Sequence, residues 1–372
     1  MRRSIVAWFA GLDPPPDVFA VVMATGILSI ASADHGYRGL DAGLSLVAAT
    51  AFVVLGLGFV IRAATHPSRV VRLTRDPDVA LRMFTFVAAC TVLAGHPGRA
   101  PVVAWALGGL AVVGWVVLVP LAVADVSSCR LAYLRDQAHG AWLLPSVATS
   151  GVAATLAQLA ASPRSPLLLV GAAVAIALAV VTYLAVAALI MWRALSQPLT
   201  PDRIPPDSWI LMGALAIAAL AGSRILTAVH VLGVPAPLGQ AAGGLTFALW
   251  AAAGLWVPAL LYGQMWRADH MLGTLHYERA WWSAVFPLGM YATASWATGA
   301  GAGMARLATI SLVFFWVAFT AWVLVAVGLI HSGVAGLLRR VVARPPHEPA
   351  HGRTGRQSRS PTAASSRADP AR

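Results

Sequence analysis

The sequence contains no lysine and few charged residues of either sign. All 26 basic residues are arginine, only 14 residues are acidic, and charged residues make up 11% of the 372 positions. Soluble domains usually carry about a quarter charged residues, so this composition excludes an ordinary soluble protein. The mean hydropathy of +0.74 predicts an integral membrane protein instead.

Motifs for cofactors, metals and covalent catalysis are also missing. The two cysteines, Cys90 and Cys129, form no CxxC or Cys/His spacing, and His270 and His276 lack the HExxH spacing of zinc enzymes. No Walker loop, GxSxG elbow or dinucleotide-binding glycine motif occurs. We therefore expect no cofactor, no metal site and no enzymatic activity.

What the sequence does have is a succession of apolar segments. About 20 apolar residues are needed to cross the hydrocarbon core of a bilayer. The sequence predicts ten such spans, all of them helical, at residues 17–34, 41–61, 80–96, 101–123, 141–161, 166–192, 208–231, 237–264, 281–299 and 306–337. We expect residues 1–13 to form an N-terminal segment, 14–337 the membrane domain and 338–372 a disordered basic tail.

The arginines predict the orientation of these spans. With the N-terminus inside, the inner loops hold eleven arginines and the outer loops only four. This distribution predicts that both termini lie in the cytoplasm. We expect the protein in the inner or plasma membrane of the cell. The net charge of +12 thus follows the membrane topology and does not predict nucleic-acid binding.

Odd and even spans differ in composition. Odd spans are rich in Ala, Gly, Ser and Thr, as in PSVATSGVAAT and YATASWATG, whereas even spans hold more long aliphatics, as in VVGWVVLVPLAV. Small residues permit close helix packing or line a polar channel, and bulky aliphatics suit lipid. The alternation predicts five helical hairpins with the odd helices inside and the even helices outside.

The ninth span, WWSAVFPLGMYATASWATG, is unusual for a lipid-facing helix. Pro287 in its interior removes a backbone donor and frees the carbonyl of Ser283, and this group must be satisfied by protein or water. Pro145 predicts a second kink, in the fifth span. We interpret both as pore kinks and expect the ninth span to line a hydrated path.

Four segments of the odd spans have a distinctive sequence: PPPDVFAVVMATGILSIAS in the first, WLLPSVATSG in the fifth, WILMGALAIAALAG in the seventh and WWSAVFPLGMYATASW in the ninth. Together they resemble the tellurite-resistance/dicarboxylate transporter family, which includes the slow anion channels. The resemblance covers residues 13 to 337. The resemblance implies ten spans in a quasi-fivefold ring around a central pore, a homotrimer and the passage of small anions. It also implies that Phe286 is the gate. The alternative is that Phe286 is an aromatic residue of the packed core.

Other residues of the odd spans are candidates for lining the pore or binding the anion. Hydroxyls donate to an anion without trapping it as a fixed charge would, although they also serve as packing groups in membrane helices. The candidates are Thr25, Gly26, Thr91, Ser146, Thr149, Ser150, Ser223, Arg224, Gly289, Thr293 and Ser295.

Two charged residues leave alternatives open. Arg224 could face the pore and attract anions, or its side chain could extend to the membrane interface, and its own span offers no acidic partner after Asp207. Asp17 is expected to cap the first helix rather than to carry protons.

The sequence therefore predicts a membrane anion channel or secondary transporter in a lipid bilayer. The substrate would be chloride, nitrate, sulfite or a dicarboxylate, and tellurite is a family label that we do not take as the substrate. The alternatives are a proton-coupled C4-dicarboxylate (malate) carrier, a sulfite exporter, a membrane-embedded enzyme and a non-transporting structural subunit.

Overall fold

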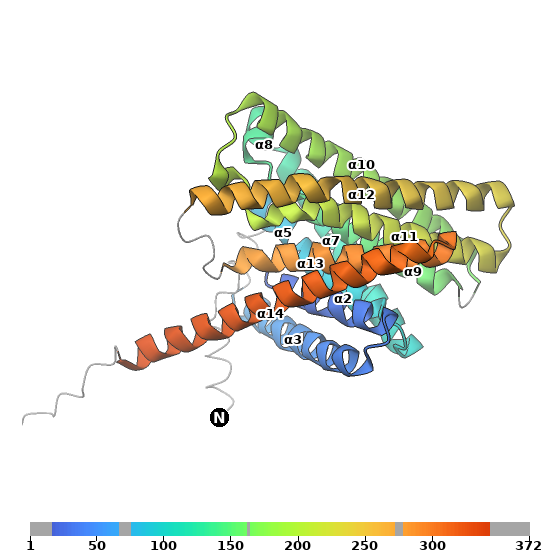
Figure 1. Ribbon diagram of the computed structural model, residues 1–372, viewed down its shortest axis with the longest axis horizontal. Coiled ribbons are helices and arrows are strands. Elements are labelled where there is room, and N and C mark those ends of the chain that lie inside the picture. Colours follow the sequence, from blue (N-terminus) through green and yellow to red (C-terminus); the bar gives the residue numbers. More distant parts are fainter. Residues whose placement is uncertain (1–16, 67–75, 162–163, 272–277, 343–372) are drawn as a thin grey trace, which may run out of the picture. The chain divides into compact units, whose positions relative to one another are not determined.

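The computed structural model describes residues 17–66, 76–161, 164–271 and 278–342, and all regular structure in these ranges is helical. Contacts divide the chain into one unit that ends at Ile330 and a second that begins at His331. The elements are α2 (Ala20–Asp34), α3 (Arg38–Thr65), α5 (Pro77–Arg82), α6 (Phe84–Ala94), α7 (Pro101–Ser127), α8 (Leu131–Gln137), η1 (Gly140–Leu143), α9 (Leu144–Ala161), α10 (Pro166–Ser196), η2 (Pro201–Arg203), η3 (Pro206–Trp209), α11 (Ile210–Leu232), α12 (Ala236–His270), η4 (Arg279–Trp281), α13 (Trp282–Ala302) and α14 (Ala305–Val342) (Figure 1).

Local sequence explains where several helices begin and end. Proline occupies the first turn of α5, α7 and α10, where its missing N–H costs nothing. The Asp76 carboxylate accepts a hydrogen bond from the Asp78 N–H and caps α5. Gly233 and Gly303 end α11 and α13 in the left-handed conformation that glycine adopts without strain.

Burial separates the helices into two classes. In the most apolar windows of the segments Pro77–Ala94, Gly140–Ala161 and Pro206–Leu232, 67 to 78% of residues are buried, against 11 to 22% in α3, α7, α10, α12 and α14. Most residues of α2 and α13 are buried as well. The predicted alternation of inner odd and outer even helices is therefore confirmed. We call α2, α6, α9, α11 and α13 the inner helices, and α3, α7, α10, α12 and α14 the outer helices.

The inner helices contact one another in a closed order. α2 packs against α6, α6 against α9, α9 against α11, α11 against α13, and α13 against α2. Glycine permits these approaches: a Cβ at Gly213 of α11 would lie 2.8 Å from the Pro287 ring of α13, and one at Gly289 would lie 2.9 Å from Ile27 of α2. Figure 1 shows α11, α12 and α13 running along a common direction.

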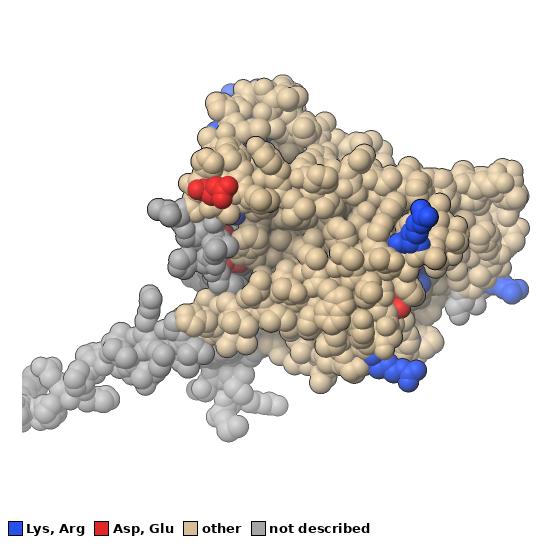
Figure 2. Space-filling model, in the orientation of Figure 1, with Lys and Arg blue, Asp and Glu red and all other residues tan. Residues whose placement is uncertain are grey.

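The outer helices present apolar side chains. Leu46, Val102, Leu167, Leu255 and Leu324 are among the most exposed large hydrophobic residues, with exposed fractions of 68 to 80%. Figure 2 shows one face on which few charged side chains interrupt a broad uncharged surface. Such a surface suits a lipid environment.

Each of the ten expected spans coincides with helical structure, but eight segments in the described part are long and apolar enough to cross a membrane. α2 has only 15 residues, and α13, with 21, is less apolar. The expected tail at 338–372 lies mostly outside the described residues, and α14 continues to Val342.

Only one of the two predicted proline kinks lies inside a helix. Pro287 lies inside α13, as expected. Pro145 lies in the first turn of α9, directly after the 3-10 turn η1, and so marks a helix start, where proline is well tolerated. Pro120 and Pro258 lie inside the outer helices α7 and α12, so an interior proline does not distinguish the inner helices.

Candidate functional site

All five inner helices line one narrow cavity. Its volume is about 30 Å³, enough for roughly one or two water molecules. Most lining side chains are apolar or small, and the polar ones are Thr91, Thr155, Gln158 and Arg224. Arg224 is the only charged residue among those that line it. The cavity therefore combines a positive group with neutral surroundings.

Arg224 projects from the C-terminal half of α11. Among the described residues, no hydrogen bond within 3.5 Å and no ion pair within 4.0 Å is found for its guanidinium, although the charge of Asp34 interacts with it. Asp34 ends α2, and its Oδ2 atom is buried without a hydrogen-bond partner. The sequence did not identify this acidic neighbour because it lies on a different helix, 190 residues away along the chain.

Three of the candidate hydroxyls bond tryptophans of the outer helices. Trp115 of α7 donates to Thr149 Oγ1 at 2.8 Å. In the same way, Trp250 of α12 donates to Ser295 Oγ at 2.8 Å, and Trp322 of α14 donates to Thr25 Oγ1 at 2.9 Å. Each bond joins an inner helix to an outer helix, so the structure supports a packing role for these hydroxyls.

The remaining hydroxyls have other surroundings. Ser146 donates to the Ala179 carbonyl of α10 at 2.8 Å, and Thr91 lines the cavity while donating to the Ala88 carbonyl. Ser150, Ser223 and Thr293 are buried, and their hydroxyl oxygens have no hydrogen-bond partner among the described residues. None of these three residues lines the cavity.

The two candidate glycines lie where inner helices meet. A Cβ at Gly26 would approach Val92 of α6 to 2.9 Å, and Gly289 meets Ile27 of α2 at the same distance. Neither glycine lines the cavity. Their positions support a packing role between inner helices.

Phe286 is buried, with 3% of its surface exposed, and it does not line the cavity. Met290, four residues later on α13, does line it. Residues four apart lie on the same face of a helix, so Phe286 occupies the next turn of that face toward the N-terminal end. The Pro287 ring beside it packs against Gly213 of α11.

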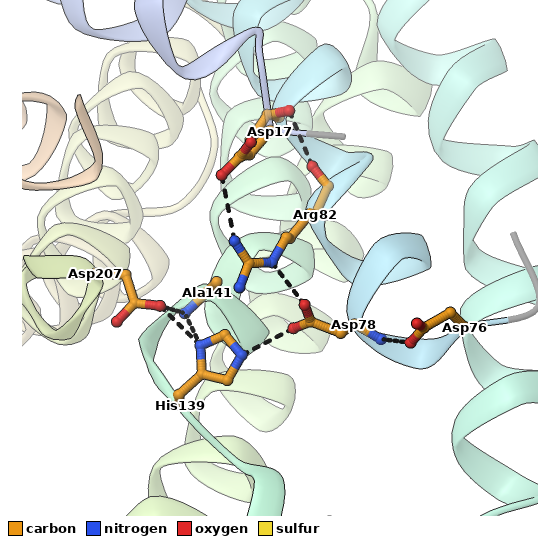
Figure 3. Close-up of polar contacts among 8 residues, drawn as sticks. Asp17, Asp76, Asp78, Arg82, His139, Ala141 and Asp207 are labelled. Carbon is orange, nitrogen blue, oxygen red and sulfur yellow. Dashed lines mark hydrogen bonds and ion pairs between the residues drawn. The ribbon is translucent and has the colours of Figure 1, made fainter. Parts of the chain in front are cut away.

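A charged network joins the N-terminal ends of four inner segments (Figure 3). Arg82 of α5 bonds Asp78 at 2.9 Å and Asp17, ahead of α2, at 3.3 Å. His139, ahead of η1, bonds Asp78 at 2.8 Å and Asp207 of η3 at 2.7 Å. Asp17 is therefore an ion-pair partner and not the expected cap, since no side chain in the described part of the chain caps α2.

His139 is the centre of this network. Burial opposes its protonation, but the hydrogen bonds and charges of Asp207 and Asp78 outweigh burial and raise the pKa of the imidazole from 6.5 to about 9. The imidazolium therefore links two carboxylates at neutral pH. Gly140, the next residue, lies so close to the Asp207 backbone that no Cβ fits between them.

We expect stability to fall as pH rises across the titration range of His139. Because its pKa is raised in the folded state, its contribution is complete below pH 6.5 and is lost as pH rises through about 9. The shift corresponds to at most about 3 kcal/mol. Thermal unfolding in detergent from pH 6 to 10 measures this loss of stability. His139→Gln should flatten the curve, whereas the exposed His230→Gln should not; parallel curves for all three proteins would contradict the assignment.

The sequence did not single out His139, Asp78, Arg82 or Asp207. They lie in short polar stretches between apolar segments, and each stretch resembles an ordinary charged loop. Their separations of 61 and 68 residues show that only tertiary structure brings them together. A clustering of charges at the starts of odd spans is the signal that could have indicated them.

The chain resembles known membrane proteins. Two curated relatives are the uncharacterized membrane proteins MT1776 and Rv1735c from the CDC 1551 and H37Rv strains of Mycobacterium tuberculosis. Each is 32% identical to this chain over 157 residues, which are 42% of this chain and 79% of the relative. Residues 14–330 match the family model SLAC1, described as "Voltage-dependent anion channel". This chain is therefore a membrane protein of the SLAC1 family of anion channels and transporters.

Proposed function

We propose that this chain provides a passive path for small anions between its five inner helices. The observation that carries the proposal is the cavity lined by all five, with Arg224 as its only charged lining residue. A positive group attracts anions, and the neutral walls offer no strong site at which an anion would remain. The closed packing order of the inner helices supports a quasi-fivefold ring.

Phe286 is the proposed gate. The cavity of about 30 Å³ is too small for a hydrated anion, so conduction requires a wider state. Phe286 lies one helical turn beyond the cavity lining on the same face of α13. Its apolar ring can occlude a narrow path and hold back water, and the adjacent Pro287 loosens the helix at that turn.

We also propose that the protein lies in the plasma membrane with both termini in the cytoplasm, and that three copies assemble with one path each. The arginine distribution supports the orientation. The resemblance of the odd spans to the tellurite-resistance/dicarboxylate transporter family supports the trimer.

Anion flux into liposomes tests this function. Purified protein would be reconstituted and assayed with chloride, nitrate, sulfite, malate and tellurite. We expect flux of small monovalent anions down their gradient without a pH gradient. Malate uptake that requires a pH gradient would favour the proton-coupled carrier instead. A sulfite exporter would move sulfite alone, and no anion flux would contradict the proposal.

Malate is the less favoured substrate. A dicarboxylate site needs two cationic or strong donor groups. The cavity lining contains one arginine, and the side chain most similar to it as a donor is the neutral amide of Gln158. This composition favours a monovalent anion.

A further inference from the structure

A second cavity, of about 260 Å³, lies at the N-terminal end of the inner helices, away from the anion path. We call it the α10/α12 pocket. Residues from these two outer helices and from the segments around η1, η2 and η3 line it. It is much larger than the cavity among the inner helices, and neither the charged network nor the anion path accounts for it.

The pocket has a basic end and an apolar wall. Arg193 and Arg203 line it, and no carboxylate does. Ile190, Trp256 and Leu260 supply the apolar wall. An occupant that matches both parts carries a negative group and a hydrocarbon portion.

The two arginines keep donors free. Within the described residues, the only hydrogen bond found for Arg193 uses one terminal nitrogen and runs to the Ala138 carbonyl at 2.7 Å. The bonds of Arg203, to the Gln197 amide oxygen and the Pro198 carbonyl, also use a single nitrogen. A guanidinium has five N–H donors in a planar fork that fits phosphate oxygens. His139 adds wall surface only, because both of its ring nitrogens already have partners.

Three acidic residues lie beside the pocket. Asp207 precedes the lining residue Ser208, and its carboxylate is paired with His139 at 2.7 Å. Asp136 accepts hydrogen bonds from Arg135 and Gln197, each at 2.7 Å, which offsets its charge. Asp202 precedes Arg203 and lies at the surface, where solvent screens it. None of the three lines the pocket, so the charge inside it remains positive.

The position of the pocket indicates a membrane interface. Trp192 is 43% exposed on α10, and the Arg135 guanidinium lies 5.3 Å from its ring centre; tryptophans of this kind are enriched at membrane surfaces. Leu184, Leu255 and Tyr262 extend an exposed apolar surface along α10 and α12. The arginine distribution places this end at the cytoplasmic leaflet, which is rich in anionic lipids.

We propose that the α10/α12 pocket binds an anionic phospholipid, with the phosphate on Arg193 and Arg203 and an acyl chain along the exposed faces of α10 and α12. The occupant is a lipid and not a free phosphate, because residues of two lipid-facing helices line the pocket and apolar side chains form most of its wall. The proposal does not depend on the anion path being conductive.

Lipid binding to the purified full-length protein tests the site. Native mass spectrometry and thermal unfolding in neutral detergent would be measured with added phosphatidylglycerol, phosphatidylcholine or inorganic phosphate. Phosphatidylglycerol should bind and raise the unfolding temperature, and the other two should not. Arg193→Gln with Arg203→Gln should weaken its binding roughly thirtyfold. Arg38→Gln with Arg306→Gln, two exposed arginines in predicted outer loops, is the matched control and should leave binding unchanged.

A second variant guards against misfolding of the arginine variants. Ala259→Trp fills the pocket without removing a charge, and Ala173→Trp places the same side chain on an exposed α10 position outside it. Only Ala259→Trp should abolish phosphatidylglycerol binding. Equal binding in both would overturn the proposal, as would an equal response to phosphatidylcholine or to free phosphate. If Ala259→Trp changes the oligomeric state and lipid has no effect, the pocket is an interface between copies and the proposal fails.

Discussion

Replacing Phe286 with Ala is expected to raise anion flux about tenfold. The ring contributes bulk and an apolar surface at the turn of α13 next to the cavity, and removing it opens a path for water. A gain of tenfold corresponds to about 1.4 kcal/mol less barrier. Chloride flux into liposomes, normalised to the amount of reconstituted protein, measures the change.

The control for this prediction is Phe315→Ala. Phe315 is also fully buried, but it lies in the outer helix α14. Truncating either phenylalanine should lower the free energy of unfolding by about 3 to 5 kcal/mol, so both variants are destabilised. Only Phe286→Ala should conduct more. A rise in both, or in neither, would argue against Phe286 as the gate.

Replacing Arg224 with Gln is expected to lower anion flux about tenfold and to weaken the preference for anions over cations. Arg224 is the only charged residue lining the inner cavity. A tenfold change in flux corresponds to a loss of about 1.4 kcal/mol of electrostatic attraction between Arg224 and the anion. A partly buried charge can supply an attraction of this size. Flux and reversal potentials in planar bilayers, with chloride gradients, measure both changes.

Asp34→Asn separates the two roles that Arg224 can have. If Arg224 attracts anions, removing the negative charge of Asp34 leaves its field less opposed, and flux should rise or stay the same. If the two residues serve only to stabilise the fold, both substitutions should lower flux in parallel with stability. Arg306→Gln, an exposed arginine on α14, should leave flux unchanged.

The sequence was a good guide to the helices and to their division into two classes. The small residues of segments such as PSVATSGVAAT and the long aliphatics of VVGWVVLVPLAV predicted inner α9 and outer α7. Whether a helix is inner or lipid-exposed depends on the composition of the whole segment. Both properties can therefore be predicted from the sequence without knowledge of the contacts. Pro287 inside α13 could be predicted for the same reason, whereas Pro145 could not be distinguished from a kink because the preceding 3-10 turn has no clear sequence signal.

Individual side-chain partners were less predictable. Thr149 and Ser295 are hydroxyl residues of the inner helices, as Ser150 and Thr293 are. The first two accept hydrogen bonds from tryptophans of outer helices, whereas the hydroxyls of the other two have no hydrogen-bond partner among the described residues. Which way a hydroxyl points depends on the rotation of its helix. A shift of one residue turns a side chain by about 100° around the helix axis.

The sequence by itself determined that this chain is an all-helical membrane protein with small-residue helices inside, because hydropathy and residue size act through each segment as a whole. Tertiary structure decided which of those residues meet: the cavity with Arg224, the electrostatic interaction of Arg224 with Asp34, the network around His139 and the α10/α12 pocket. Each of these joins residues from separate helices. Their contacts depend on helix rotation and register, which a single helix does not encode.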